Sequence, residues 1–270
     1  MRSQHIAMSW EQYEQLPPHP GWKHEYWDGM AHISPRSRFA VVRMDVHPRP
    51  VRSPLDLQAI GAADEASLTS AYLDAFRDTV EYCDWEEDAI ARSAVENVRG
   101  YCAARRRGEP LFACSFLARD PAPQDESEAV VGAALLMRTE DRRPMLDMLF
   151  IRPRWQRRGL ATALLSRCLE ELHRREEPIL RSRYHLANEA SQAWHRGFGF
   201  TEEPDLSLAQ LYLRCAGQEL RRRESAGRLG DEERRALLAD LERWEGQVKE
   251  LERIADEQGR EAVSPTLRIR

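Results

Sequence analysis

The chain has 270 residues, of which 42% are hydrophobic and 31% are charged, and its formal net charge is −5 at pH 7. This composition indicates one main domain with appendages that folds without disulfides or structural metals, and the acidic balance does not favour nucleic acid as a partner. The five cysteines show no paired spacing, which favours a reducing cytoplasm. No signal peptide or membrane-spanning run is visible, so we expect a soluble protein with no membrane partner.

The chain opens with an aromatic arm, residues 1–38, in which we expect a β-hairpin. Asp28 and Gly29 stand between aromatic and apolar residues, and an Asp-Gly pair favours a two-residue hairpin turn. The segment is similar to the opening hairpin of Uma-type restriction endonucleases. No nuclease residues follow it, so metal-dependent DNA processing is the least favoured of the three functions that the sequence suggests.

Several side chains of the arm are of the metal-ligand type: His24, Glu25, Asp28 and His32. Their spacing matches no zinc signature such as H-E-x-x-H, and polar residues commonly decorate a hairpin. We therefore predict no metal site.

A domain of mixed α/β class is expected over residues 39–215, because periodicities typical of strands and helices follow one another along it. Ser67 is the expected N-cap of the first helix. The strands are predicted at 39–47, 111–119, 129–139, 144–151, 179–187 and 206–214, and the helices at 67–83, 87–107, 158–175 and after Asn188. This order predicts a mixed sheet with helices on its faces.

A charged helical extension is expected over residues 216–270. Apolar residues recur there at heptad spacing, at Leu237, Leu241, Trp244, Val248, Leu251 and Ala255. Such a helix needs a partner. An intramolecular hairpin with a helix near residues 216–225 and a homodimer through the heptad helix satisfy the pattern equally well.

The most informative segment is the run from Leu146 to Leu165. An apolar strand ends before Pro153, and a helix starts after a short basic loop at Gly159. Backbone N–H groups at such a helix start converge on one point, where the helix dipole and nearby arginines favour an anion. The arginines are Arg154, Arg157 and Arg158. We therefore expect a phosphate cradle, and a pyrophosphate as its ligand.

Two motifs resemble the GNAT N-acetyltransferase superfamily. The first is Gln156-Arg157-Arg158-Gly159-Leu160-Ala161, which is similar to the acetyl-CoA loop of the family, Gln/Arg-x-x-Gly-x-Gly/Ala. The second runs from Asn188 to Phe200 and is similar to the family's Asn, short helix and Gly-Phe. The resemblance covers residues 39–215 and implies the GNAT acyl-CoA N-acyltransferase fold, with the amino-terminal hairpin arm and the carboxy-terminal helical extension added to it.

The resemblance also implies acetyl-CoA as cosubstrate. The amides of the loop would hold the pyrophosphate, the pantetheine arm would lie along the motif strand as an additional strand, and the Leu149 N–H would bond the thioester carbonyl. The implied acetyl-CoA-binding residues are Leu149, Phe150, Ile151, Gln156, Arg157, Arg158, Gly159, Leu160, Ala161, Thr162 and Asn188.

Direct transfer to an amine needs a proton donor for the departing thiolate and a base for the amine. The family usually has a donor Tyr where this chain has His195, and Tyr184 is a substitute. For the base we expect Asp147, which alternation places on one face of the motif strand, although an acid there could equally pair with an arginine. Further acids that could reach the acceptor are Glu25, Asp28, Glu86 and Glu87.

These features predict an N-acetyltransferase that acts on an amine, with a small molecule favoured because no basic surface is evident. The alternative is an acyl-CoA-binding sensor or interaction protein without catalytic activity. A sensor would bind acetyl-CoA without consuming it.

Overall fold

The residues that the structure describes form two β-sheets, one of eight strands and one of three. The computed structural model describes residues 2–104, 108–123, 125–227 and 229–258. The described chain forms two compact units. The first comprises Val41–Arg183 and Ala193–Thr201, and the second comprises Arg2–Ala40, Tyr184–Gln192 and the residues from Glu202 onward.

The larger sheet is mixed, as predicted. Its order is β11-β4-β10-β9-β8-β7-β5, with β6 beside β8. β7, β8 and β9 are antiparallel, whereas β10 runs parallel to β9. In chain order the strands are β4 (Phe39–Asp45), β5 (Leu57–Ala59), β6 (Glu109–Pro110), β7 (Phe116–Arg119), β8 (Val130–Arg138), β9 (Pro144–Ile151), β10 (Ile179–His185) and β11 (Thr201–Glu202).

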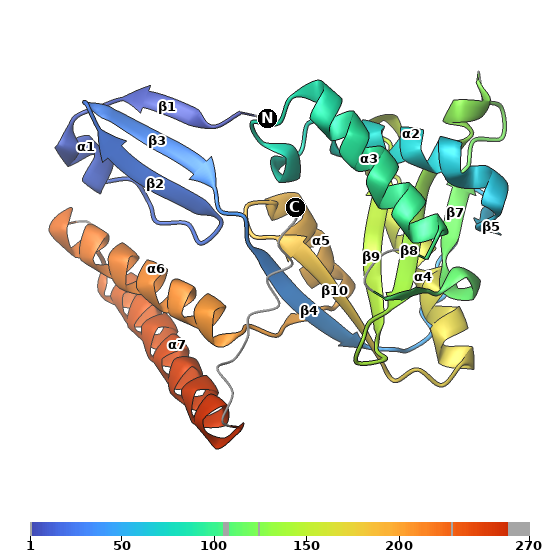
Figure 1. Cartoon of the computed structure of the whole chain (residues 1–270). Helices are drawn as coiled ribbons and strands as arrows, with labels where there is room; N and C mark the ends of the chain where they lie inside the picture. Colours follow the sequence, from blue (N-terminus) through green and yellow to red (C-terminus); the bar gives the residue numbers. More distant parts are fainter. Residues whose placement is uncertain (1, 105–107, 124, 228, 259–270) are drawn as a thin grey trace. The chain divides into compact units, whose positions relative to one another are not determined.

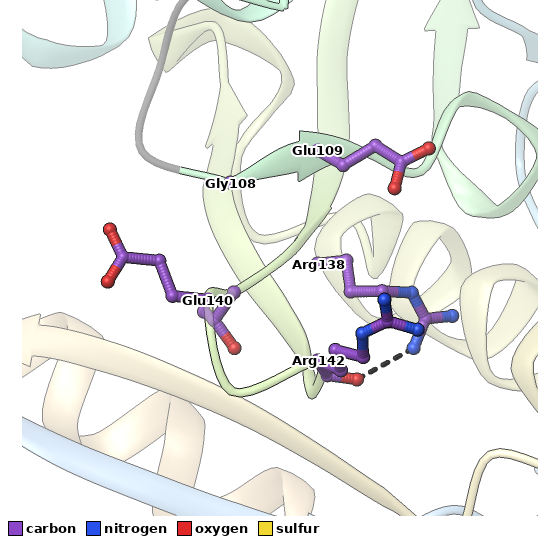
Figure 2. A pocket seen from close by; sticks show the side chains of 6 residues that line it. Gly108, Glu109, Arg138, Glu140 and Arg142 are labelled. Atoms are coloured by element: carbon purple, nitrogen blue, oxygen red, sulfur yellow. Dashed lines mark hydrogen bonds between the residues drawn. The ribbon is translucent and has the colours of Figure 1, made fainter.

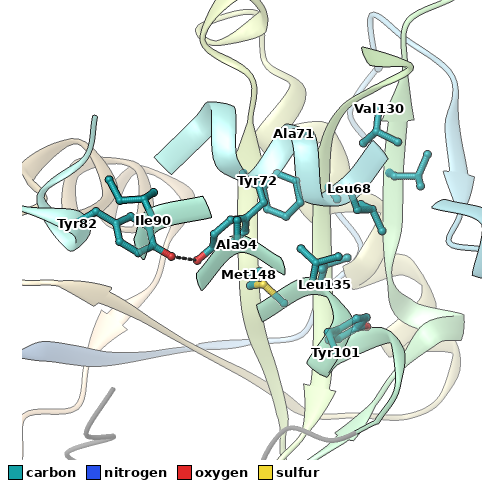
Figure 3. Packing of buried hydrophobic residues seen from close by; sticks show 14 residues of the cluster. Leu68, Ala71, Tyr72, Tyr82, Ile90, Ala94, Tyr101, Val130, Leu135 and Met148 are labelled. Carbon is teal, nitrogen blue, oxygen red and sulfur yellow. Dashed lines mark hydrogen bonds between the residues drawn. The ribbon is translucent and has the colours of Figure 1, made fainter. Parts of the chain in front are cut away.

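Helices cover both faces of β7, β8 and β9 (Figure 1). The helices are α2 (Glu65–Phe76), α3 (Glu87–Cys102) and α4 (Leu160–Arg174), and α5 (Glu189–Phe198) passes from the second unit into the first. α2 and α3 pack on one face around buried Leu68, Ile90 and Leu135 (Figure 3). α4 covers the other face, where the Arg167 guanidinium lies 4.9 Å from the ring centroid of Phe116. This layering confirms the predicted mixed α/β class.

Tyr101, labelled in Figure 3, is a residue of α3 whose buried hydroxyl bonds to the sheet. The hydroxyl donates to the Leu136 carbonyl of β8 at 2.8 Å and lies 2.8 Å from the Ser115 hydroxyl. Ser115 in turn accepts from the Leu136 N–H at 2.9 Å. Burial raises the pKa of Tyr101, so the phenol stays protonated and serves as a donor.

Ser67 is not the N-cap that the sequence suggested. α2 begins two residues earlier, at Glu65, and the buried Ser67 hydroxyl accepts from the Val130 N–H at 3.0 Å. It also lies 3.2 Å from the Glu126 carbonyl. Ser67 therefore joins α2 to β8, a role that its own sequence neighbours do not reveal.

Three predicted elements are shorter than expected. α2 ends at Phe76, and Val80–Tyr82 forms a separate 3₁₀ helix. α3 ends at Cys102, and residues 105–107 of the predicted helix lie outside the described residues. Within the predicted strand 111–119, Phe112–Cys114 is a 3₁₀ turn and only β7 is extended.

The second unit contains the predicted hairpin, β2 (Trp22–Trp27) and β3 (Met30–Pro35). Asp28 and Gly29 have φ angles of 52° and 73°, as a two-residue hairpin turn requires. The sequence did not indicate β1 (Gln4–Ala7), which pairs with β3, or the short helix α1 (Trp10–Glu14).

The imidazole of His32 stacks on Trp27, with ring centroids 3.3 Å apart. His32 lies opposite Glu25 in the register, whereas His24 lies opposite Ile33. Because side chains alternate between faces, His24 points away from the Glu25 and His32 pair. The four polar residues of the arm therefore do not converge.

The predicted strand 206–214 is wrong, because these residues belong to α6 (Leu206–Ser225). The Asp205 carboxylate caps this helix by accepting from the Leu208 N–H at 2.7 Å. The buried residues follow a helical spacing, at Leu208, Ala209, Leu211 and Ala216. Leu206-Ser207-Leu208 also fits the two-residue alternation of a strand. The capping contact of Asp205 with the Leu208 N–H shows that the segment is a helix.

α7 (Asp231–Gln258) lies along α6 of the same chain (Figure 1). Trp244 of the heptad seam packs on Tyr212, with ring centroids 4.5 Å apart. The intramolecular hairpin therefore describes the structure, and the homodimer stays a prediction. Residues 259–270 of the extension lie outside the described residues. None of the described helices is both long and apolar enough to cross a membrane.

Tyr101→Phe should lower the free energy of unfolding by about 1–2 kcal/mol, because the buried Leu136 carbonyl loses one of its two donors and the Ser115 hydroxyl loses a partner. Urea denaturation measures this change. Tyr26→Phe is the control, since that hydroxyl donates to the Met8 carbonyl at a half-buried place and water can replace it. A Tyr101→Phe variant as stable as the parent would contradict the role assigned to this hydroxyl.

Candidate functional site

The carboxyl-terminal half of β9 has a strand on only one side. β8 pairs with β9 as far as Gly132 and Ile151. On the other side, the described residues give one register pair between β9 and β10, Met145 with Arg181. Within the first unit no further register pair follows, and none of its strands pairs beyond Met145 with the β9 edge that faces away from β8.

The open edge exposes backbone groups of Leu149 and Ile151. The Arg152 N–H donates to the Val131 carbonyl of β8 at 2.8 Å. Backbone groups of successive residues alternate between the two edges of a strand, so those of Phe150 also point to β8, whereas those of Leu149 and Ile151 point away from it. The Gln156 amide donates to the Ile151 carbonyl at 3.0 Å. The described residues of the first unit therefore leave the Leu149 N–H and C=O and the Ile151 N–H without a backbone partner.

The loop after β9 forms a concave array of N–H groups. Arg157 and Gly159 are both left-handed, with φ angles of 59° and 80°. Alternation of left-handed and right-handed residues produces an anion-binding nest. Gly159 occupies the N-cap position of α4, where no described side chain caps the helix, so the N–H groups of Leu160, Ala161 and Thr162 point into this space. A Cβ built on Gly159 would meet no atom within 4 Å, so the space beside this residue is open.

Two of the three predicted arginines are available at this nest. Arg157 and Arg158 are exposed, and Arg158 lies over the Trp155 ring, 4.9 Å from its centroid. Arg154 instead forms an ion pair with Glu128 at 2.9 Å. An acid distant in sequence engages Arg154, and its contribution to the cradle stays a prediction.

Arg152 is a residue that the sequence reasoning missed. Its side chain is 4% exposed, and it donates to the Val130 carbonyl at 2.8 Å. It also forms an ion pair with Asp74 of α2 at 2.9 Å. Arg152 thus fixes the chain where β9 ends and the loop begins. Its partners are distant in sequence, so no local pattern could have revealed this role.

His195 is buried on α5, 5% exposed, and its Nε2 lies 2.9 Å from the Ser182 hydroxyl of β10. Both residues belong to the first unit. The rings of Trp194 and Phe200 contact the imidazole with centroid distances of 4.9 and 5.1 Å. The imidazole is therefore held in one orientation by packing and by Ser182, which the sequence did not single out.

Tyr184 and Asn188 lie in the second unit. The Tyr184 hydroxyl donates to Glu202 and accepts from the Gln192 amide at 3.1 Å. Burial raises the pKa of Tyr184, and Glu202 raises it further, so the phenol keeps its proton. Asn188 accepts from the Ser191 N–H at 3.0 Å and so caps α5.

Asp147 has a buried side chain, 2% exposed, and pairs with Arg183 of β10 at 3.5 Å. The structure therefore contains the second alternative of the sequence analysis, an acid paired with an arginine, and the base role stays a prediction. Among the other acids named, Glu87 forms an ion pair with Arg77 at 3.2 Å. Glu86 is exposed at the N-cap position of α3, and Glu25 and Asp28 belong to the second unit.

The other predicted residues have backbone roles at most. Phe150 is 3% exposed and packs on Tyr72 of α2, with ring centroids 5.5 Å apart. Leu160 is 1% exposed, so only its N–H can meet a ligand. Cys168 on α4 is fully buried, and burial raises the pKa of its thiol, which excludes the thiolate that a nucleophile requires.

A separate pocket lies at the opposite end of β9. Figure 2 shows it at the β8–β9 turn, with Arg138 donating to the Arg142 carbonyl at 2.7 Å. It is lined by Gly108, Glu109, Arg138, Thr139, Glu140 and Arg142. None of the predicted site residues lines it. The chemistry is therefore better placed at the Ile151 end of the strand, where the open edge and the nest adjoin.

A family model described as the acetyltransferase (GNAT) family matches residues 65–200, half of the chain. The chain belongs to this GNAT acetyltransferase family. The matched range takes in β9, the loop, α4 and α5, and the resemblance seen in the sequence is thereby confirmed. The arm and the α6–α7 hairpin lie outside the range that defines this GNAT protein. No curated protein matches the chain.

Solved structures of low identity are similar to this GNAT protein. A GCN5-related N-acetyltransferase from Sphaerobacter thermophilus is 16% identical with a TM-score of 0.42, over 74% of this chain and 56% of that one. PaiA N-acetyltransferase from Thermoplasma acidophilum, in complex with coenzyme A, is 12% identical with a TM-score of 0.42, over 56% and 92%. The ribosomal-protein-S18-alanine N-acetyltransferase from Escherichia coli is 19% identical with a TM-score of 0.39, over 55% and 79%. The chain thus spans little more than half the length of the Sphaerobacter protein.

Proposed function

We propose that this GNAT protein transfers the acetyl group of acetyl-CoA directly to an amine, and that the acceptor is a small molecule. One observation carries the proposal: the open backbone edge of β9 leads into an uncapped, nest-like start of α4. An extended amide chain that ends in a pyrophosphate matches both parts. The formal net charge of −5 supports a small acceptor over a nucleic acid.

The residues present fit acetyl-CoA. The N–H groups from Arg157 to Thr162 would receive the pyrophosphate, and the exposed Arg157 and Arg158 would supply positive charge. The pantetheine amides would pair with the free groups of Leu149 and Ile151, as an added strand does. Gln156 would act indirectly, since its amide holds the Ile151 carbonyl and so fixes the loop beside the strand.

The transfer needs one fixed donor and two proton movements. The neutral amine attacks the thioester carbon, the C–N bond forms, and the Leu149 N–H stabilises the charge that develops on the carbonyl oxygen. The C–S bond then breaks, the amine nitrogen gives up a proton, and the departing thiolate takes one. We assign the donation to His195, whose ring Ser182 orients. Tyr184 is the substitute donor. Asp147 is the base that the sequence predicts, and its ion pair with Arg183 favours a positioning role over that of a base.

A second candidate is an acyl-CoA-binding sensor. The observation that favours it is that both proposed acid–base groups already have protein partners, Ser182 for His195 and Arg183 for Asp147. A sensor would use the same edge and nest without turnover. Thiol release in the presence of a panel of amines distinguishes the two functions, because only the transferase consumes acetyl-CoA.

Gly159→Val should weaken acetyl-CoA binding by at least about tenfold, or ~1.4 kcal/mol, because a branched side chain would fill the nest. Titration calorimetry measures the affinity. Gly227→Val is the matched control, since Gly227 also has a left-handed φ, 61°, and open space around it, so the backbone strain is comparable. Equal affinity of the two variants would remove the cradle from the proposal.

His195→Gln should keep acetyl-CoA affinity and lower kcat by about 100-fold or more, because an amide can bond Ser182 but cannot deliver a proton. A variant with the activity of the parent would return His195 to a packing role.

A further inference from the structure

β9 and β10 are held together at two successive points before they separate. The first is the backbone pair of Met145 with Arg181. The second lies two residues further along both strands, where the side chains of Asp147 and Arg183 form an ion pair at 3.5 Å. In the described residues the ladder does not continue past this point, and Leu149 is the next residue whose backbone faces the open edge.

β9 is also irregular toward its other neighbour at the same residue. In the β8–β9 register, Leu135 is opposite Met148 and Leu136 is opposite Leu146, so Asp147 has no opposite residue. Such a bulge bends the strand that carries the extra residue. β9 therefore bends at Asp147, the residue whose side chain contacts β10.

The carboxylate at this bend is buried at a cost. The Asp147 side chain is 2% exposed and that of Arg183 is 19% exposed. A buried carboxylate is tolerated when a cation compensates it, and removal of one partner leaves the other charge without compensation. The direction of β9 beyond Asp147 is thus coupled to a contact with β10.

We propose that Asp147 and Arg183 are positioning residues that fix where the Leu149 N–H stands relative to β10. The inference rests on the proposed function, because the edge that they set is the proposed pantetheine site. Loss of either charge should let β9 shift at the bulge and misalign its donor with the thioester, even though neither side chain need touch acetyl-CoA.

The test compares Asp147→Asn, Arg183→Gln and the double variant by calorimetry with acetyl-CoA and by the pH profile of kcat/KM. Each single change should weaken affinity about tenfold, and the double variant should be no weaker than the singles, since both remove one interaction. The pH profile should keep its shape, and Arg183→Lys should restore part of the affinity. Arg181→Gln is the control, because that guanidinium pairs with Asp141 of the β8–β9 turn at 3.1 Å.

The contrary result is specific. In that result, Asp147→Asn abolishes turnover, keeps the affinity for acetyl-CoA and removes the acidic limb of the pH profile, while Arg183→Gln stays active. Asp147 would then be the base, and the positioning role would be overturned. The amide chemical shift of Leu149 in the ligand-free protein gives an independent readout. It should move in both single variants, and an unchanged shift would also overturn the inference. Failure of the parent protein to bind acetyl-CoA would instead refute the proposed function.

Discussion

The structure of the candidate site depends on the separation of β9 from β10. Inside a sheet, backbone groups of a strand normally have partners on both sides, and unpaired groups are costly when water cannot reach them. β9 meets this requirement toward β8, whereas within the first unit its other edge has no register pair after Met145. The same strand then runs into the start of α4, where further N–H groups lack partners. One continuous run of backbone therefore presents donors in two geometries, one extended and one concave.

This arrangement places recognition in the backbone rather than in side chains. The side chains nearby have supporting tasks: Arg152 fixes the end of β9, and Gln156 holds the Ile151 carbonyl. Gly159 has no side chain, and the space beside it is open. Backbone recognition suits a ligand with a regular amide chain and a pyrophosphate. Backbone recognition also leaves the choice of amine to other surfaces. Membership of the family therefore defines the class of reaction but not the amine.

The sequence predicted those parts of the site that depend on neighbouring residues. A strand, a proline, a basic loop and a glycine at a helix start are local signals, and each lies where expected. Contacts between distant residues could not be predicted: Arg154 with Glu128, Ser67 with Val130, and Asp147 with Arg183. The mistaken strand at 206–214 has another cause. Its leucines fit both a period of two and a helical spacing, and the capping contact of Asp205 resolves the ambiguity only in three dimensions.

Hydrogen exchange of backbone amides, read by NMR with and without acetyl-CoA, tests the central claim most directly. The account predicts that acetyl-CoA protects the amides of Leu149, Ile151 and Leu160 to Thr162. The Phe150 amide, which faces β8, should already be protected in the free protein and should change little. Protection that omits Leu149 and Ile151, or that appears only outside β9 and the start of α4, would contradict the assignment of this backbone as the acetyl-CoA site.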